Sequence, residues 1–520
     1  MDRFELERRK LLKGMGLLGA GGVLTACGGG TSHSSDVGDW GGDGATPPGD
    51  LGSTPPAPAP APACKTPVAT IPLTIDASVA ATGIPADVPI RAYITGLVKV
   101  PGQVFYRYDG QTMQPVQMLT GDNTVTDSTK AVTGLSGNTY DTNYPSIWAD
   151  YSIALDRSCP TLVADLASFN TTTIPGFGTG PAAFSGRIWI SVGTPQIPFT
   201  PRVGADPSGT GTVDGYTTPV VTAGGPGCYC LYDWLEFSWS ATGELFLNTT
   251  QVDQYGFPIS IQASGATVDG GIQGVYTQSR SAILADLAAI GNPLFGTTLP
   301  VPGTGVAAGT YPPVANTQGI LRALAPSSTS GATTNTYLDG VIAQALNAWE
   351  TTWLQVTCPS NALQQTYYGQ TASDGKTLNF YNDEKMTGGV QFSFNDLTTY
   401  NVLDCNGTMT GVGVPQVGDL LGDLKNTGKA ILAGFNRGVI SSSTTAIDID
   451  NSGTGSNYQP PLSQNFTSTT LPFNVWVQKF HTWSANGMAY GFAYDDVGDQ
   501  DPSVHAQGTT GVTIILGQFA

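Results

Sequence analysis

Short runs of β-branched and aromatic residues, separated by Gly, Pro and Asn, fill most of the chain after residue 66. Residues 186–192 (Gly-Arg-Ile-Trp-Ile-Ser-Val) and 390–394 (Val-Gln-Phe-Ser-Phe) are typical. Such runs between turn-forming residues predict β-strands, and many of them in succession are typical of a sandwich or a barrel. We therefore expect a mainly β protein.

Two segments have helical periodicity instead. Residues 279–290 begin at a serine that can cap a helix and are followed by glycine, and residues 337–354 place apolar side chains three and four apart. They predict a mixed α/β lobe at 266–385, inserted into a β lobe formed by 66–265 and 386–520. A groove between the two lobes is the expected binding site.

Residues 233–253 predict a β-hairpin around an Ala-Thr-Gly-Glu turn. Pairing Ser240 with Leu245 places Glu236 and Asp253 on one face. Hydrolysis of a glycosidic bond needs two carboxyl groups, one to protonate the leaving oxygen and one to activate water or attack the anomeric carbon. Straight strands separate these two acids by about 13 Å, so twist or a bulge must bring them closer. Solvated strand carboxylates are the alternative that the spacing leaves open.

The composition agrees with a turn-dense β protein, because the 520 residues include 67 Gly and 36 Pro and only 12% are charged. The formal charge of −18 argues against a nucleic-acid partner, whereas neutral sugar polymers fit it. Only three His are present, and we expect no metal and no cofactor. A metal site at Cys228 and Cys230 is the less favoured alternative to disulfide bonding.

The first 27 residues predict an export signal. Arg8 and Arg9 precede a short apolar stretch and resemble a twin-arginine signal, although an ordinary positive n-region is the alternative. Leu-Thr-Ala before Cys27 resembles a bacterial lipoprotein box, which implies lipidation at Cys27 and membrane contact only through that anchor. Residues 28–65 are rich in Gly, Ser and Pro and predict a linker. The expected location is the bacterial cell envelope or the extracellular space.

Six further cysteines remain in this exported chain, and their even number predicts up to three disulfides. The pairing stays open, since six cysteines allow fifteen combinations. They are Cys64, Cys159, Cys228, Cys230, Cys358 and Cys405.

Several segments resemble glycoside hydrolase family 64, the thaumatin-like β-1,3-glucanases that release laminaripentaose. The first is Trp-Leu-Glu-Phe-Ser-Trp at 234–239, followed by Val-Asp at 252–253 and Gly-Phe-Pro-Ile at 256–259. Later segments that match in order are Gly-Ile-Leu-Arg at 319–322, Asp-Cys-Asn-Gly at 404–407, Phe-Asn-Arg-Gly at 435–438 and Ala-Tyr-Gly-Phe-Ala-Tyr-Asp-Asp-Val-Gly at 489–498. Together they cover most of the chain after residue 66.

This resemblance implies a thaumatin-like fold in which Glu236 is the general acid and Asp253 the general base of an inverting enzyme. It implies endo-type hydrolysis of β-1,3-glucan to short laminari-oligosaccharides by a monomer. Gln251, where the family has an aromatic residue, and insertions near 122–140 and 203–224 leave the product length open. Residues expected to contact the sugar are Ser238, Ser240, Trp239, Asn248, Tyr255, Tyr490 and Asp496.

A non-catalytic, thaumatin-like surface lipoprotein that binds β-glucan is the main alternative, because one fold can host both functions. A surface adhesion lipoprotein is a third hypothesis, suggested by the Thr-, Ser- and Gly-rich composition. Retention of both acids in family-like contexts favours the enzyme.

Overall fold

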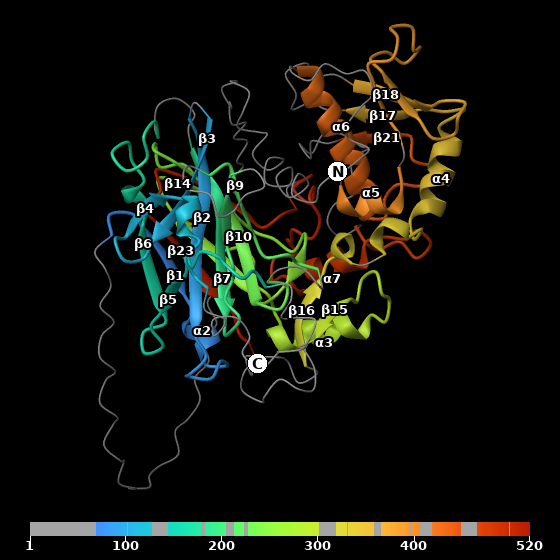
Figure 1. The fold of residues 1–520 in the computed structure, drawn as a ribbon. Coiled ribbons are helices and arrows are strands. Elements are labelled where there is room, and N and C mark those ends of the chain that lie inside the picture. Colours follow the sequence, from blue (N-terminus) through green and yellow to red (C-terminus); the bar gives the residue numbers. More distant parts are fainter. Residues whose placement is uncertain are drawn as a thin grey trace, which may run out of the picture.

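The computed structural model in Figure 1 shows a mainly β protein with several sheets and a small number of helices. The predicted fold class is confirmed in this respect. Residues described here are 69–100, 102–126, 144–177, 183–203, 213–222, 227–300, 319–329, 331–357, 366–395, 397–405, 419–448, 465–498 and 500–519. Cys27, the predicted export signal and the predicted linker lie outside them.

Two sheets enclose the first hydrophobic core. The larger has nine strands in the order β14-β22-β11-β10-β7-β2-β3-β4, with β5 paired to β2, and the smaller has the order β13-β23-β1-β6. The strands are β1 (Pro72–Asp76), β2 (Ile90–Val100), β3 (Gly102–Asp109), β4 (Gln114–Gln117), β5 (Ile153–Leu155), β6 (Thr161–Asp165), β7 (Ala183–Val192), β10 (Leu231–Ser240), β11 (Leu245–Thr249), β13 (Ile259–Ser264), β14 (Thr267–Asp269), β22 (Ser503–Gln507) and β23 (Gly511–Leu516).

Alternating apolar residues of these strands point into the space between the sheets, as a sandwich requires. β1 and β23, from opposite ends of the described chain, pair in parallel. A separate two-stranded ribbon is formed by β8 (Thr200–Arg202) and β9 (Gly215–Thr217). Tyr216 of this ribbon packs against a separate cluster of aromatic residues on the outer face of the nine-stranded sheet, which includes Tyr93, Trp189 and Trp234.

A second hydrophobic core is built from helices and two smaller sheets. The helices of this core run from yellow-green to red in Figure 1. The helices outside the first lobe are α3 (Arg280–Ala289), α4 (Asp339–Ala348), α5 (Thr399–Asp404), α6 (Asp419–Asn436) and α7 (Val475–Trp483), whereas α2 (Ser78–Ala81) belongs to the sandwich. The strands are β12 (Gln254–Tyr255), β15 (Thr298–Pro300), β16 (Ile320–Leu324), β17 (Leu354–Thr357), β18 (Thr366–Thr371), β19 (Leu378–Tyr381), β20 (Phe392–Phe394) and β21 (Ala446–Asp448).

Both predicted helices are present. In α3 the Ser279 side chain accepts the backbone N–H of Ala282, as expected of a cap, and α4 occupies the middle of the second predicted segment. The predicted lobe boundary at residue 386 is wrong, because 392–497 contribute to the second core through Phe392, Phe435, Trp476 and other residues. The chain rejoins the sandwich at β22. None of the helices in the described ranges is long and apolar enough to cross a membrane.

Three of the cysteines expected in disulfides, Cys228, Cys230 and Cys405, are buried thiols. Cys159 is disulfide-bonded. Since three of six cysteines remain thiols, three disulfides do not form. Both cysteines of the C-x-C pair at 228 and 230 are buried, and the Cys230 thiol donates to the Gln196 carbonyl at 3.0 Å.

Candidate active site

In the hairpin that carries Glu236, Ser240 pairs with Glu244 and not with Leu245 as the sequence predicts. The Ser240 N–H donates to the Glu244 carbonyl at 2.9 Å, and Gly243 adopts a left-handed conformation with φ of 81°. Asn248, rather than Thr249, is therefore the cross-strand partner of Glu236. The predicted register is wrong, and the strand-alternation argument for placing Asp253 on the Glu236 face fails with it.

Alternation along β10 separates two kinds of residue. Leu235, Phe237 and Trp239 point into the sandwich core. Glu236 and Ser238 therefore point to the opposite face of the sheet and are half-buried. Trp239 was expected to contact sugar, but it is 3% exposed within the core, so this expectation is wrong.

Glu236 is held by an arginine on the neighbouring strand. Arg187 of β7 is its cross-strand partner, and Arg187 Nη2 donates to Glu236 Oε1 at 3.1 Å. The guanidinium carbon lies 5.0 Å from the ring centre of Trp234 and 5.4 Å from that of Trp189. Two aromatic rings and a charged partner thus fix the guanidinium, and the guanidinium fixes the carboxylate.

Hydroxyl groups continue the polar row on both sides of this pair. Ser238 Oγ lies 3.2 Å from Ser185 Oγ on β7. Thr95 Oγ1 of β2 accepts the Trp189 indole N–H at 3.0 Å. Asn248 on β11 is half-buried beside Glu236. Around the Glu236 and Arg187 pair, the outer face of the sheet therefore presents hydroxyl and amide groups.

Ser240 lies at the end of this face but is occupied by the hairpin turn. Its Oγ accepts the Glu244 N–H at 3.0 Å and lies 2.8 Å from Thr242 Oγ1. In the structure its hydroxyl serves the turn, which is a common use of serine.

The segment at residues 490–496 approaches the same region from the second core. The pKa of the Tyr490 hydroxyl lies well above its ordinary value, first because it is buried and then because the Asp496 and Glu236 carboxylates disfavour its ionisation. The backbone of Tyr490 contacts the segment that carries Asp253, because the Tyr490 carbonyl accepts the Gln251 N–H. Asp496 is paired with Lys429 of α6 at 3.2 Å, and Lys429 also lies 5.3 Å from the Tyr494 ring centre.

Asp253 is buried, with 5% of its surface exposed, just before β12. Its carbonyl accepts the N–H of Ala325 at 3.1 Å. Two residues earlier, Gln251 donates its N–H to the Tyr490 carbonyl at 2.8 Å and accepts the Trp476 indole N–H at 2.9 Å. The segment that carries Asp253 is therefore tied to the second core, whereas Glu236 lies on the sandwich.

A buried carboxyl group on β10 binds the backbone of the segment that carries Asp253. Asp233 on β10 accepts the N–H of Gly256 at 2.7 Å. Burial raises the pKa of Asp233 to about 7, against the influence of the backbone N–H groups of Gly256, Trp234 and Phe257. Sequence inspection did not select Asp233 as a functional residue, because a buried supporting role has no local sequence signal.

Tyr255 was expected to contact sugar, and this expectation is also wrong. Its ring is completely buried in the second core, where it lies 5.3 Å from Phe480 and 6.2 Å from Tyr276. Within the described ranges no group of His, Cys, Asp and Glu has the arrangement of a metal site. Arg187 and Lys429 were missed, because their acidic partners are 49 and 67 residues away in the sequence.

Comparison with known proteins identifies the family of the chain and relatives of its fold. The model of glycoside hydrolase family 64, described as β-1,3-glucanase, matches residues 82–516. A laminaripentaose-producing β-1,3-glucanase solved in complex with laminaritetraose is similar with a TM-score of 0.56 and 20% identity, over 87% of this chain and 100% of that one. A β-1,3-glucanase domain from Clostridium beijerinckii is similar with a TM-score of 0.60 and 19% identity, over the same shares. These structures share the fold. No curated protein sequence matches the chain.

Proposed function

Since the chain belongs to glycoside hydrolase family 64, the β-1,3-glucanases, we propose that it cleaves long β-1,3-glucan internally and with inversion, using Glu236 as general acid and Asp253 as general base. Membership makes the chain a glycoside hydrolase. The proposal adds the two catalytic residues, the stereochemistry and the release of short laminari-oligosaccharides.

The observation that carries the proposal is the environment of Glu236. It is the half-buried carboxylate at the centre of the polar row on β10, and Arg187 holds it in a fixed orientation. A general acid must meet the leaving oxygen at hydrogen-bond distance, so a fixed rotamer favours proton transfer. A solvated strand acid would not need a guanidinium that is itself held against the neighbouring Trp189 and Trp234 rings.

Asp253 suits the role of the base because it lies on a separate, anchored segment. In an inverting enzyme, a water molecule enters between the second carboxylate and the sugar, opposite the acid. Glu236 lies on β10 of the sandwich, whereas the segment of Asp253 is held by the second core through Gln251 and by Asp233 of β10 through Gly256. Bond cleavage then transfers the Glu236 proton to the leaving oxygen while Asp253 takes a proton from the attacking water.

Four residues remain as proposed sugar contacts: Ser238, Asn248, Tyr490 and Asp496. Ser238 lies two residues from Glu236 on β10, and Asn248 is the cross-strand partner of Glu236 on β11. Tyr490 and Asp496 belong to the segment that packs in the second core through Ala489, Phe492 and Tyr494. Hydroxyl, amide and carboxylate groups can bind the hydroxyl groups of a neutral sugar. The laminaritetraose in the relative's solved structure supports a β-1,3-linked ligand.

Export and lipidation at Cys27 form a separate part of the proposal. A polymer too large to import must be cleaved outside the cell, and a lipid on Cys27 followed by the 28–65 linker would tether the enzyme there. Cys27→Ala should move the protein from the membrane fraction to the medium. Unchanged membrane association would contradict lipid anchoring and leave the catalytic proposal intact.

Digestion of laminarin and curdlan by the purified full chain tests the catalytic proposal, with product length and anomeric form followed by NMR. The wild type should release α-anomeric oligosaccharides. Glu236→Gln and Asp253→Asn should each lower kcat by about 100-fold or more while glucan binding is retained. Binding without any hydrolysis by the wild type would favour a non-catalytic glucan-binding protein.

A further inference from the structure

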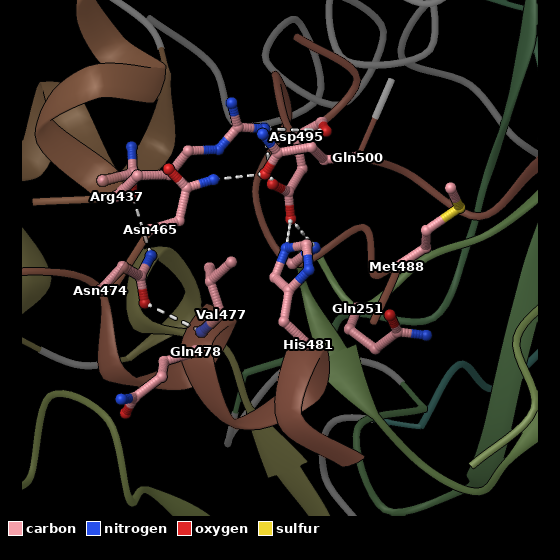
Figure 2. A network of polar contacts seen from close by, with 12 residues as sticks. Gln251, Arg437, Asn465, Asn474, Val477, Gln478, His481, Met488, Asp495 and Gln500 are labelled. Atoms are coloured by element: carbon pink, nitrogen blue, oxygen red, sulfur yellow. Dashed lines mark hydrogen bonds and ion pairs between the residues drawn. The ribbon is translucent and has the colours of Figure 1, made fainter. Parts of the chain in front are cut away.

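A buried charge network of Asp495, Arg437 and His481 (Figure 2) lies next to the segment that contains Tyr490 and Asp496. At its centre is Asp495, which is completely buried. Asp495 Oδ1 accepts Arg437 Nη2 at 3.1 Å, and Oδ2 lies 3.1 Å from His481 Nε2 on α7. The Gly491 N–H donates to the same Oδ2 at 3.0 Å. The Asp495 carboxylate therefore holds three partners, Arg437, His481 and the Gly491 backbone, rather than forming a simple ion pair.

The partners of His481 decide its charge. Its Nδ1 lies 2.7 Å from the Gly487 carbonyl oxygen, and its Nε2 faces the Asp495 carboxylate. A carbonyl oxygen only accepts, and a carboxylate that already accepts from Arg437 and Gly491 is an acceptor as well. Each ring nitrogen of His481 therefore faces an acceptor. The imidazolium form satisfies both acceptors, whereas either neutral tautomer leaves one nitrogen lone pair facing an oxygen.

The same network fixes both ends of the segment. Arg437 donates to the Val497 carbonyl at 2.8 Å and to the Asp495 carbonyl at 3.1 Å, while Asp495 holds Gly491. Tyr490 precedes the segment held in this way, and its carbonyl accepts Gln251. Asp496 lies inside the segment and faces Lys429. Removing a member of the network should therefore displace both Tyr490 and Asp496.

We propose that His481, as an imidazolium, is a positioning residue for glucan binding that acts through Asp495 on Tyr490 and Asp496. The inference rests on the proposed function, because these two residues are its proposed sugar contacts. The groups that face His481 are the Asp495 carboxylate, Arg437 behind it, the Gly487 carbonyl and the Phe466 ring, 5.4 Å away.

The charge of His481 can be measured on the wild-type protein. The chain has three histidines, so a sample with ¹⁵N-labelled histidine gives few signals, and His481→Gln assigns the one of interest. At pH 7 both ring nitrogens of His481 should carry protons. A neutral tautomer would overturn the proposal. This result does not depend on whether the protein hydrolyses glucan.

The positioning role is tested by a double-mutant cycle on laminari-oligosaccharide hydrolysis. His481→Gln should raise KM about three- to tenfold, with kcat changed by less than about twofold. In an Asp496→Asn background the same substitution should have a smaller effect, since the route through Asp496 is already lost and only the one through Tyr490 remains. Equal, additive effects would show a merely structural role and overturn the proposal.

His505→Gln is the matched control, because His505 Nε2 also faces a carboxylate, Glu244, at 3.2 Å but lies on β22. Its KM should match that of the wild type. Thermal denaturation identifies variants that fail to fold, and for such a variant His481→Asn replaces Gln in the cycle. A wild type without glucanase activity would refute the proposed function, while the nitrogen signals would still decide the charge of His481.

Discussion

Arg187 Nη2 lies 3.1 Å from Glu236 Oε1, and the two residues are direct cross-strand partners on β7 and β10. Strand pairing fixes their backbones, and the guanidinium lies 5.4 Å from the Trp189 ring centre and 5.0 Å from that of Trp234. The orientation of the candidate acid is therefore determined by a residue from another part of the chain. Bidentate or stacked arginine is not equivalent to lysine at such a position.

Replacing Arg187 should lower activity without removing either acid. Arg187→Met keeps most of the side-chain volume but leaves Glu236 free to change rotamer, and misplacement of a catalytic group lowers the rate steeply. We expect kcat/KM for laminarin to fall about 10- to 100-fold. The kcat/KM of Arg187→Lys should lie between that of Arg187→Met and that of the wild type, because lysine retains the charge but has no planar group to stack on the indoles.

Arg107→Met is the control for this experiment. Arg107 lies on the same sheet, pairs with Asp109 at 3.1 Å and sits 5.1 Å from the Tyr151 ring centre, so it loses similar interactions. Its kcat/KM should stay near the wild-type value. Equal losses in both variants would show that arginine matters for the sheet in general and would contradict the specific role of Arg187.

Ser238 and Trp239 are adjacent but lie on opposite faces of β10, so their substitutions should have different consequences. Ser238→Ala should raise KM for laminari-oligosaccharides several-fold and leave stability within about 0.5 kcal/mol. Trp239→Phe should lower the free energy of unfolding by about 1–3 kcal/mol through incomplete filling of the core and leave KM unchanged. Steady-state kinetics and denaturant unfolding of both variants test the assignment of faces.

How far the sequence predicts this structure depends on whether a feature is local. The hairpin at β10 and β11 and the cap of α3 follow from neighbouring residues, and both are present. The register was missed by one residue because the hydrogen bond between Ser240 and Glu244 depends on turn geometry. A one-residue slip exchanges the faces of a strand, which is why Asp253 could not be placed by alternation.

Non-local features were largely beyond prediction. The pairing of Arg187 with Glu236 depends on which strand lies beside β10. Trp239 and Tyr255 were chosen as sugar contacts because of their chemistry, yet aromatic residues in alternating strands pack into a core just as well. The family resemblance located both candidate acids, but their supports in the second core required the three-dimensional structure.

Asp501 should make stability depend on pH. Burial, followed by the Asp496 and Asp495 carboxylates, raises its pKa from 3.8 to about 6, and a hydrogen bond from Ser503 opposes the shift. Because the folded state holds this proton more tightly than the unfolded state, its contribution to stability is complete below pH 3.8 and is lost as the pH rises through 6. Between these values Asp501→Asn should make the fall in unfolding free energy less steep.

Denaturant unfolding from pH 4 to 7 measures this slope, and Asp374→Asn serves as the control. Hydrogen bonds from Thr377 and Lys376 lower the pKa of Asp374 to about 2, so its contribution is lost only at more acidic pH. The Asp374 variant should therefore keep the wild-type slope. An unchanged slope in the Asp501 variant would show that the proton is not held there.

Gly186 should tolerate no side chain, because it precedes Arg187 where β7 runs between β2 and β10. A Cβ at this position would overlap the Thr95 carbonyl oxygen and press on Gly96. Gly186→Ala must push these strands apart and should lower the free energy of unfolding by about 1–3 kcal/mol. Gly340→Ala, on an exposed turn of α4 with open space around it, should instead raise that free energy by about 0.5–1 kcal/mol. Calorimetric unfolding of both variants distinguishes an effect of close strand approach from a general effect of alanine. Changes of the same sign in the two free energies of unfolding would contradict the specific role of Gly186.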